Sequence, residues 1–215
     1  VDALGYNPAG LADETWQTFN LGGMGYAYAE SKREGEKRVL EFNERGLEVV
    51  VIYPGFMLGP CDYTLQAGRL FYDLRERKVP ACPPGGASFG HVVEVAKAHV
   101  AATTAGRPGE GYVCAGVNTS FRELIRMMAE AIGAKPPRIT APRSLFVSYG
   151  YLAEALSAFT GKAPDMNPGQ ARYMSINAAY SSDRAVRELG YRVVPLPRQI
   201  EDALDWYRAN DLWKD

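Results

Sequence analysis

Apolar residues along the chain follow two patterns, one typical of a strand buried on both faces and one typical of helices. Residues 47–54, LEVVVIYP, are a continuous and largely β-branched apolar run that ends at a proline. Such a run is typical of a central strand of a parallel sheet, which helices cover on both faces. Residues 25–45 are rich in Glu, Lys and Arg and are followed by Gly46, which predicts a helix with a glycine stop. A helix followed by a buried strand indicates an α/β fold.

The rest of the chain alternates helical patterns with short extended segments. We predict further helices over residues 64–78, 91–106, 120–133, 143–161, 168–176, 182–190 and 197–210, and extended segments over 111–116 and 136–142. Two segments rich in Gly and Pro, 55–62 and 79–90, are predicted to be loops. Residues 143–161 are apolar over most of their length, so we expect this helix to be buried, with a lobe core lined by Phe146, Tyr149, Tyr151 and Leu152. The second half should therefore form a mostly helical lobe beside the sheet.

Composition and charge exclude several classes of function. The 215 residues are 47% hydrophobic and 23% charged, which is typical of a globular protein with a real core. The formal net charge of −1 favours neither a nucleic-acid partner nor an anionic membrane. The three cysteines Cys61, Cys82 and Cys114 are far apart, and only two histidines are present, so the sequence predicts no metal site and no disulfide framework. A reducing cytoplasm is the simplest setting.

The chain carries no recognisable membrane or export signal. No apolar run approaches the roughly 20 residues of a membrane span. The first ten residues, VDALGYNPAG, lack the basic region and apolar core of a signal peptide. They are instead typical of a loop, with no strand or helix before them, so we expect the chain to be a fragment of a longer protein.

Tyr28 and Lys32 are the first candidates for chemistry. They are four residues apart in a predicted helix, so their side chains should share one face. With 13 tyrosines and 7 lysines, this spacing arises by chance about 0.4 times in such a chain. The pair alone is therefore explained equally well by a solvent-exposed helix face and by a catalytic site.

The order of motifs around this pair is more specific. Tyr28 begins the run Tyr-Ala-Glu-Ser-Lys, and the buried strand leads into Pro54-Gly55 and Gly59-Pro60. Later segments with distinctive sequences are SFGHVVEVAKAHVAA at 88–102, SSDRAVRELGY at 181–191 and IEDALDWYRAN at 200–210. This order resembles the extended short-chain dehydrogenase/reductase family, in particular its nucleotide-sugar epimerase and dihydroflavonol-reductase-like group. The resemblance covers essentially the whole chain and corresponds to the family's second half.

The resemblance implies a Rossmann-like doubly wound parallel sheet whose amino-terminal strands are absent from this chain. It assigns residues 1–62 to the second half of the dinucleotide-binding domain and 63–215 mainly to a substrate-binding lobe, with about 79–104 returning to the sheet. The family's glycine-rich phosphate turn is not found, since LGGMGYAY at 21–28 has a different glycine spacing. The family's catalytic Ser or Thr would lie just upstream of Val1.

The resemblance also implies roles for individual residues. Tyr28 would be the general acid or base, and Lys32 would favour its phenolate and bind the nicotinamide ribose of NAD or NADP. The backbone and side chains after the strand would lie against the nicotinamide, which implicates Pro54, Gly55, Phe56 and Met57. Taken singly, each of these four is explained nearly as well by a turn that needs Pro and Gly. The substrate would be a small carbonyl compound or alcohol, and the helix at 26–43 would pack on its copy in a homodimer.

Four further positions have other expected roles. His91 begins a helix after a glycine-rich loop, where it could face substrate or simply cap and pack. Tyr53 and Glu94 stand where many relatives have arginine and aspartate, so both could reshape the substrate side. Tyr26 is two residues from Tyr28, off the catalytic face, and is predicted to pack.

Three functions remain open from the sequence. The first is an NAD(P)-dependent reductase or dehydrogenase, and the second is an epimerase or dehydratase that uses the same tyrosine. The third is a non-catalytic module that binds a nucleotide or a protein partner, which the missing glycine turn suggests. The sequence does not choose between NAD and NADP and does not identify the substrate.

Overall fold

The computed structural model describes residues 1–214 and has an α/β fold. Its helices are α1 (Ala27–Leu40), α2 (Arg69–Arg75), α3 (Val92–Ala105), α4 (Phe121–Ala131), α5 (Arg143–Thr160), α6 (Pro168–Tyr173), α7 (Asp183–Leu189) and α8 (Leu196–Ala209), with a short 3-10 helix η1 (Asn43–Arg45). Its strands are β1 (Val51–Pro54), β2 (Phe56–Leu58), β3 (Gly86–His91), β4 (Gly111–Cys114) and β5 (Val117–Ser120).

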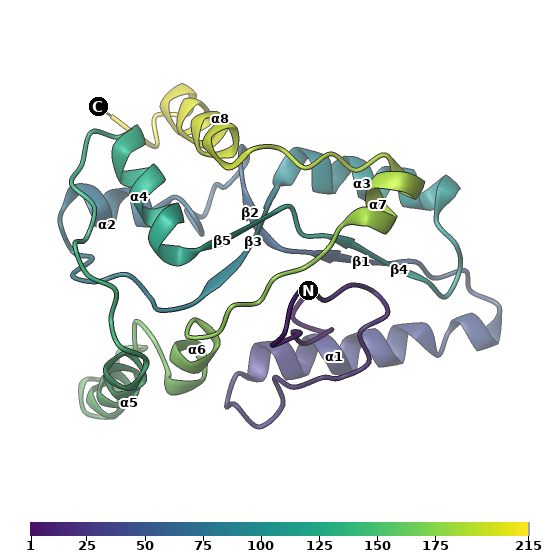
Figure 1. Cartoon of the computed structure of the whole chain (residues 1–215), viewed down its shortest axis with the longest axis horizontal. Helices are drawn as coiled ribbons and strands as arrows, with labels where there is room; N and C mark the ends of the chain where they lie inside the picture. The colour runs from purple at the N-terminus through teal and green to yellow at the C-terminus, as the bar shows by residue number, and fades with distance from the viewer. Residues whose placement is uncertain (215) are drawn as a thin grey trace.

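Strands β1 and β4 form the parallel sheet that the apolar run predicts. They pair in register from Val51 opposite Gly111 to Pro54 opposite Cys114. Helices α3 and α7 cover one face of this sheet, whereas α1 and the amino-terminal loop lie on the other (Figure 1). Tyr112 and Val113 are adjacent in β4, so their side chains point to opposite faces of the sheet. Both are fully buried, as expected for a strand that is covered on both faces.

The second sheet corrects the two loop predictions. Strands β2, β3 and β5 lie in that order, with β2 parallel and β5 antiparallel to β3, so strands lie within both 55–62 and 79–90. All six residues of β3 are buried. A Cβ at Gly86 would lie 2.7 Å from the Thr119 carbonyl oxygen. The glycines that suggested a loop therefore permit close backbone approach inside a strand.

The lobe has its own core, formed where α2, α4 and α8 pack over the second sheet. Its largest fully buried side chains include Phe71, Met128 and Ile200. The α4 helix begins at the predicted cap, because the Ser120 hydroxyl accepts a hydrogen bond from the Glu123 amide at 3.1 Å.

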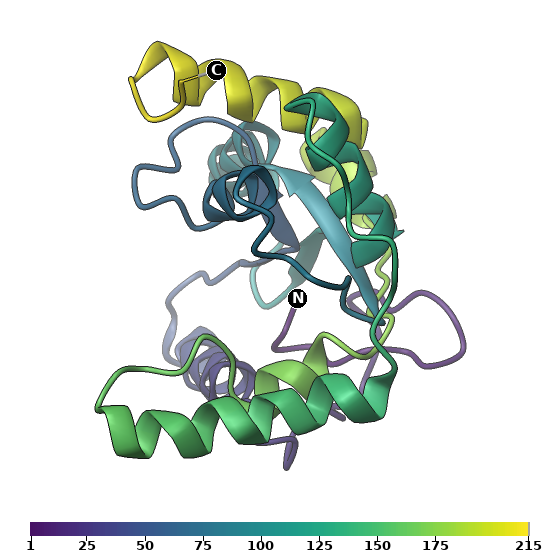
Figure 2. The same ribbon diagram turned by 90° about the vertical axis from the view of Figure 1, so that its left-hand side faces the viewer.

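Helix α5 is exposed, so the prediction that it lines the lobe core is wrong. Within α5 only Gly150 is buried, while Tyr149, Tyr151 and Leu152 are each about half exposed. The helix lies at the edge of the molecule and packs mainly on α6 (Figure 2). At this contact a Cβ on Gly150 would lie 3.0 Å from Pro168 Cα, so the close approach requires glycine there. The many apolar residues of α5 therefore do not mean that the helix is buried.

Candidate functional site

The structure places the Tyr28 and Lys32 side chains together on α1. The Lys32 ammonium lies over the Tyr28 ring, 5.1 Å from the ring centroid. Tyr28 is 53% exposed, and within residues 1–214 its hydroxyl makes no hydrogen bond. The shared face predicted from the spacing of four is confirmed, and the phenol is open to a ligand with a cation beside it.

One further turn along α1, a buried carboxylate ties this helix to the sheet. The Tyr53 hydroxyl donates to Glu36 Oε1 at 2.6 Å, and Arg33 pairs with the other oxygen at 3.1 Å. Burial, and then the hydrogen bond to Glu36, raises the pKa of Tyr53, so its hydroxyl remains a donor. Tyr53 therefore braces the helix that carries Tyr28 against the strand that leads into Pro54.

Residues 54–57 form an open surface at the carboxyl end of β1. A Cβ at Gly55 would lie 2.6 Å from the carbonyl oxygens of Ala115 and Ser88, so no side chain fits there. Phe56 and Met57 are 41% and 46% exposed. In open α/β sheets, ligands bind outside the carboxyl ends of the strands, which is where this apolar surface lies.

A row of four aromatic rings joins Tyr28 to Phe56. The Tyr28 and Tyr26 ring centroids are 5.8 Å apart, Tyr26 stacks on Tyr173 at 4.7 Å, and Tyr173 lies 6.4 Å from Phe56. The prediction that Tyr26 packs is confirmed. The row brings the two groups of predicted site residues to one region through Tyr173 of α6, which sequence reasoning missed.

Asp2 anchors the middle of this row and was also missed. Its carboxylate accepts a hydrogen bond from the Tyr173 hydroxyl at 2.6 Å and a longer one from the Tyr26 hydroxyl at 3.5 Å. Burial, and then the negative charge of Asp2, raises the pKa of both phenols, so Tyr26 and Tyr173 stay protonated. No local sequence signal marks Asp2, because it lies in a loop and its partners are distant in the chain.

The structure does not bring His91 into this row. His91 is 7% exposed, and its Nδ1 accepts a hydrogen bond from the Val93 amide at 3.3 Å, which caps α3. Its Nε2 lies 3.2 Å from a carboxylate oxygen of Asp202 on α8. His91 thus caps α3 through Nδ1, while its buried Nε2 lies near Asp202 without making a hydrogen bond.

Glu94 is likewise engaged away from the row. It pairs with Lys97 at 2.7 Å and with Arg192 at 3.0 Å, and its side chain is 7% exposed. Among residues 1–214, no group of three His, Cys, Asp or Glu side chains is arranged to hold a metal ion. In the same part of the chain, no helix has the length and apolar character needed to cross a bilayer.

Comparison with known proteins gives both sequence relatives and structural neighbours. No family model matches the chain. The chain is 27% identical over 213 residues to sterol demethylase protein B of Methylococcus capsulatus, covering 98% of this chain and 65% of that protein. It is 32% identical over 199 residues to 3beta-hydroxysteroid-dehydrogenase/decarboxylase isoform 1 of Arabidopsis thaliana, covering 83% of this chain and 45% of that protein. The chain thus spans about half to two-thirds of these relatives.

Among solved structures, the crystal structure of gox2253 has a TM-score of 0.80 at 30% identity, over 99% of this chain and 65% of that one. A nucleoside-diphosphate-sugar epimerase from Pseudomonas aeruginosa has a TM-score of 0.77 at 22% identity, over 99% of this chain and 66% of that one. These likenesses agree with the motif order that begins at Tyr28 and with the parallel β1–β4 pairing. The relatives and neighbours fit the extended short-chain dehydrogenase/reductase family that the motif order resembles.

Proposed function

We propose that this chain supplies the acid–base side of an NAD(P)-dependent oxidoreductase, which reduces a ketone or aldehyde or oxidises the corresponding alcohol. The observation that carries the proposal is the placement of the Lys32 ammonium over the Tyr28 ring, next to a free hydroxyl. Because the chain spans 45% and 65% of two relatives, the activity is proposed for the longer protein of which it would be a part.

In this proposal Tyr28 moves the proton. Its hydroxyl donates a proton to the carbonyl oxygen during reduction and accepts the proton of the alcohol during oxidation. The Lys32 cation lies over the ring that loses the proton, where it would stabilise the negative charge left behind. Lys32 is at the same time the proposed partner of the nicotinamide ribose.

The surface at residues 54–57 fits a nicotinamide ring. Phe56 and Met57 offer exposed apolar area at the strand end. When bound, NAD(P)H supplies the hydride. Structural neighbours described as complexes with NAD and with NADPH support the choice of cofactor, but do not favour one of the two.

Tyr28→Phe in the full-length protein tests the proposal. Loss of the phenolic proton should lower turnover by about two orders of magnitude or more, while the affinity for NAD(P)H changes little. A panel of ketosteroids and dihydroflavonols, with NADH and with NADPH, provides the assay. The matched control is Tyr63→Phe, because Tyr63 is 71% exposed and lies outside the row. Unchanged turnover in Tyr28→Phe would contradict the assignment.

A second reaction would use the same residues. In an epimerase or dehydratase the cofactor is oxidised and re-reduced within one turnover, so no reduced cofactor is consumed overall. The likeness to a nucleoside-diphosphate-sugar epimerase supports this alternative. Net consumption of NAD(P)H separates the two, since only a reductase consumes it.

We also propose that the protein acts in the cytoplasm as a homodimer that uses the exposed side of α1. The exposed apolar residues Val39 and Phe42, at the end of this helix, support such a contact. Sedimentation of the full-length protein and of Val39→Glu tests it, and a monomeric wild-type protein would contradict it.

A further inference from the structure

We propose that Tyr173, anchored by Asp2, is a positioning residue that fixes the start of α1 and thereby sets the position of the Tyr28 hydroxyl. The inference rests on the proposed role of Tyr28. It concerns residues that lie far from α1 in the sequence, in α6 and at the beginning of the chain.

The start of α1 is not fixed by a cap of its own. Tyr26 occupies the cap position, and its side chain makes no capping hydrogen bond. Besides the bonds within the helix, the Ala29 amide donates to the Tyr26 carbonyl at 3.1 Å, and the Glu30 carboxylate accepts a hydrogen bond from the Gly23 amide at 3.0 Å. Helix starts are usually held by Ser, Thr, Asp or Asn at the cap position, so here contacts from other elements add to the support.

Helix α6 supplies that support through three separate contacts. Its backbone at Gly169 touches Gly25 so closely that a Cβ would lie 2.0 Å from the Gly25 carbonyl oxygen. The Arg172 guanidinium donates to the Met24 carbonyl at 2.7 Å. The third contact is the Tyr173 ring, which stacks on Tyr26 at 4.7 Å with 24° between the planes.

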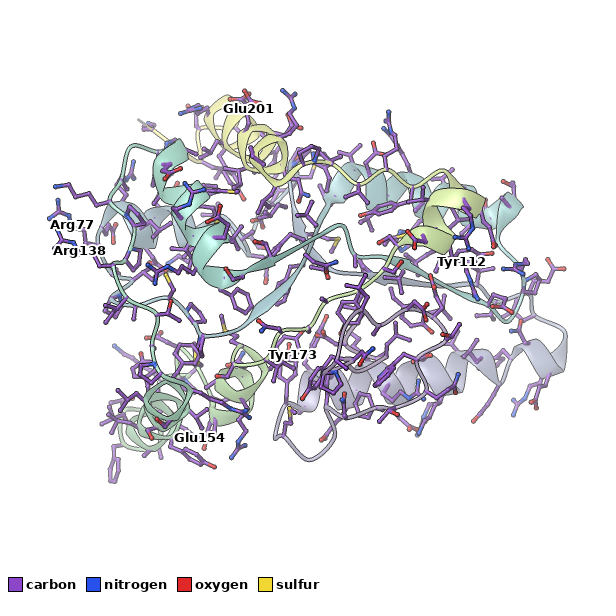
Figure 3. All side chains as sticks on the ribbon, viewed as in Figure 1. Arg77, Tyr112, Arg138, Glu154, Tyr173 and Glu201 are labelled. Carbon is purple, nitrogen blue, oxygen red and sulfur yellow. The ribbon has the colours of Figure 1, made fainter. Side chains whose placement is uncertain are left out.

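Asp2 fixes Tyr173 in turn. The Tyr173 hydroxyl donates to the carboxylate at 2.6 Å, and Tyr173 is 5% exposed. A charge-assisted bond of this length, in a buried setting, holds the ring in one orientation. Figure 3 marks Tyr173 near the middle of the molecule, between α6 and α1.

The last step is from Tyr26 to Tyr28. Their rings lie 5.8 Å apart, and Tyr28 is in the first turn of the helix that Tyr26 begins. If the Tyr173 ring is removed, Tyr26 loses its stacking partner and the first turn of α1 loses one of its three contacts with α6. A displacement of about 1 Å at a reacting group can lower a rate about 100-fold. The Phe56 ring of the Pro54–Met57 surface also lies 6.4 Å from Tyr173, whereas removal of the Tyr26 ring leaves that contact in place and should leave the surface able to bind its cofactor.

Four variants of the full-length protein test this inference. Tyr173→Leu removes the ring and the hydroxyl, and should lower kcat about 30-fold or more. Tyr173→Phe keeps the ring, and should restore kcat to within about fivefold of wild type. Tyr26→Leu breaks the link while leaving Tyr173 in place, and should reproduce the kcat loss even if Tyr173→Leu does not fold, while the Kd for NAD(P)H stays within about twofold. Tyr112→Leu is the control, because Tyr112 is fully buried on the opposite face of the sheet, where it should affect stability and not kcat.

The outcomes separate this inference from the proposed function. If Tyr28→Phe is inactive while Tyr173→Leu and Tyr26→Leu keep wild-type kcat, the function stands and the positioning role is overturned. A loss of kcat in Tyr26→Leu that Tyr112→Leu also shows to the same degree would overturn it too, because the role would then be merely structural. If Tyr28→Phe is itself active, the proposed function fails first.

Discussion

At the scale of single residues, Asp62 organises the loop that follows β2. Its carboxylate accepts hydrogen bonds from the amides of Gln66, Ala67 and Gly68 at 2.7 to 3.0 Å, and from the Tyr207 hydroxyl at 2.9 Å. Burial alone would raise the pKa of Asp62, but these hydrogen bonds outweigh it and hold the pKa below its usual value. One side chain thus joins this loop to α8.

The lowered pKa of Asp62 gives a prediction about stability and pH. A carboxyl whose pKa is lower in the folded state stabilises the fold above its unfolded pKa of about 4, and the contribution is lost as the pH falls below that value. Asp62→Ala should therefore lower the free energy of unfolding by about 1 to 3 kcal/mol at pH 7, and by less near pH 3.5. Urea denaturation at the two pH values measures the difference.

The control for this experiment is Asp205→Ala, whose carboxylate is 64% exposed and should contribute less than about 1 kcal/mol. A loss of unfolding free energy in Asp62→Ala that is the same at both pH values would contradict the lowered pKa of Asp62.

Sequence reasoning at this scale identifies pairs that are close along the chain. Tyr28 and Lys32 come together because helix geometry alone determines their spacing. Tyr173 and Asp2 could not be found in this way, because their hydrogen bond joins positions 171 residues apart and depends on how α6 packs. Tertiary packing, not local pattern, makes them part of the site.

At the scale of elements, two helical glycines have opposite roles. A Cβ at Gly35 in α1 would meet nothing within 4 Å, whereas a Cβ at Gly150 in α5 would lie 3.0 Å from Pro168 Cα and 3.1 Å from the Asn167 carbonyl oxygen. In both helices alanine has the better intrinsic propensity. The difference therefore lies in packing, which is absent around Gly35 and tight at the α5–α6 contact.

We expect the two alanine variants to change stability in opposite directions. Gly35→Ala should raise the free energy of unfolding by about 0.5 to 1 kcal/mol, through the helix propensity alone. Gly150→Ala should lower it by about 1 to 3 kcal/mol, because backbone atoms of α6 would have to move. Thermal unfolding of both variants measures this. A thermal unfolding midpoint that rises as much in Gly150→Ala as in Gly35→Ala would contradict the packing of α5 on α6.

The elements differ in how far the sequence predicts them. Of residues 47–54, which were predicted as a buried strand, Val51–Pro54 form β1, whereas Leu47 is 58% exposed and precedes the strand. The exposed α5 was predicted to be buried because apolar content was taken to imply a core. Strand β3 was predicted as a loop, because glycine signals both turns and close backbone approach.

At the scale of the whole molecule, the candidate site is assembled from three separate parts. Tyr28 comes from α1, Phe56 from β2 beyond the parallel sheet, and Tyr173 from α6 on the lobe side (Figures 1 and 3). This arrangement, in which a phenol with a cation beside it is linked by stacked rings to an open strand end, is the basis of the proposed hydride chemistry. Its central claim is that Tyr28 provides the proton when the hydride is transferred.

The most direct test is a single-turnover measurement on the full-length protein. Wild type and Tyr28→Phe, each preloaded with NAD(P)H, are mixed rapidly with the carbonyl substrate, and oxidation of the bound cofactor is followed by its absorbance. The account predicts a rate at least about 100-fold lower in Tyr28→Phe, with cofactor occupancy unchanged. Equal rates of hydride transfer in the two proteins would contradict it.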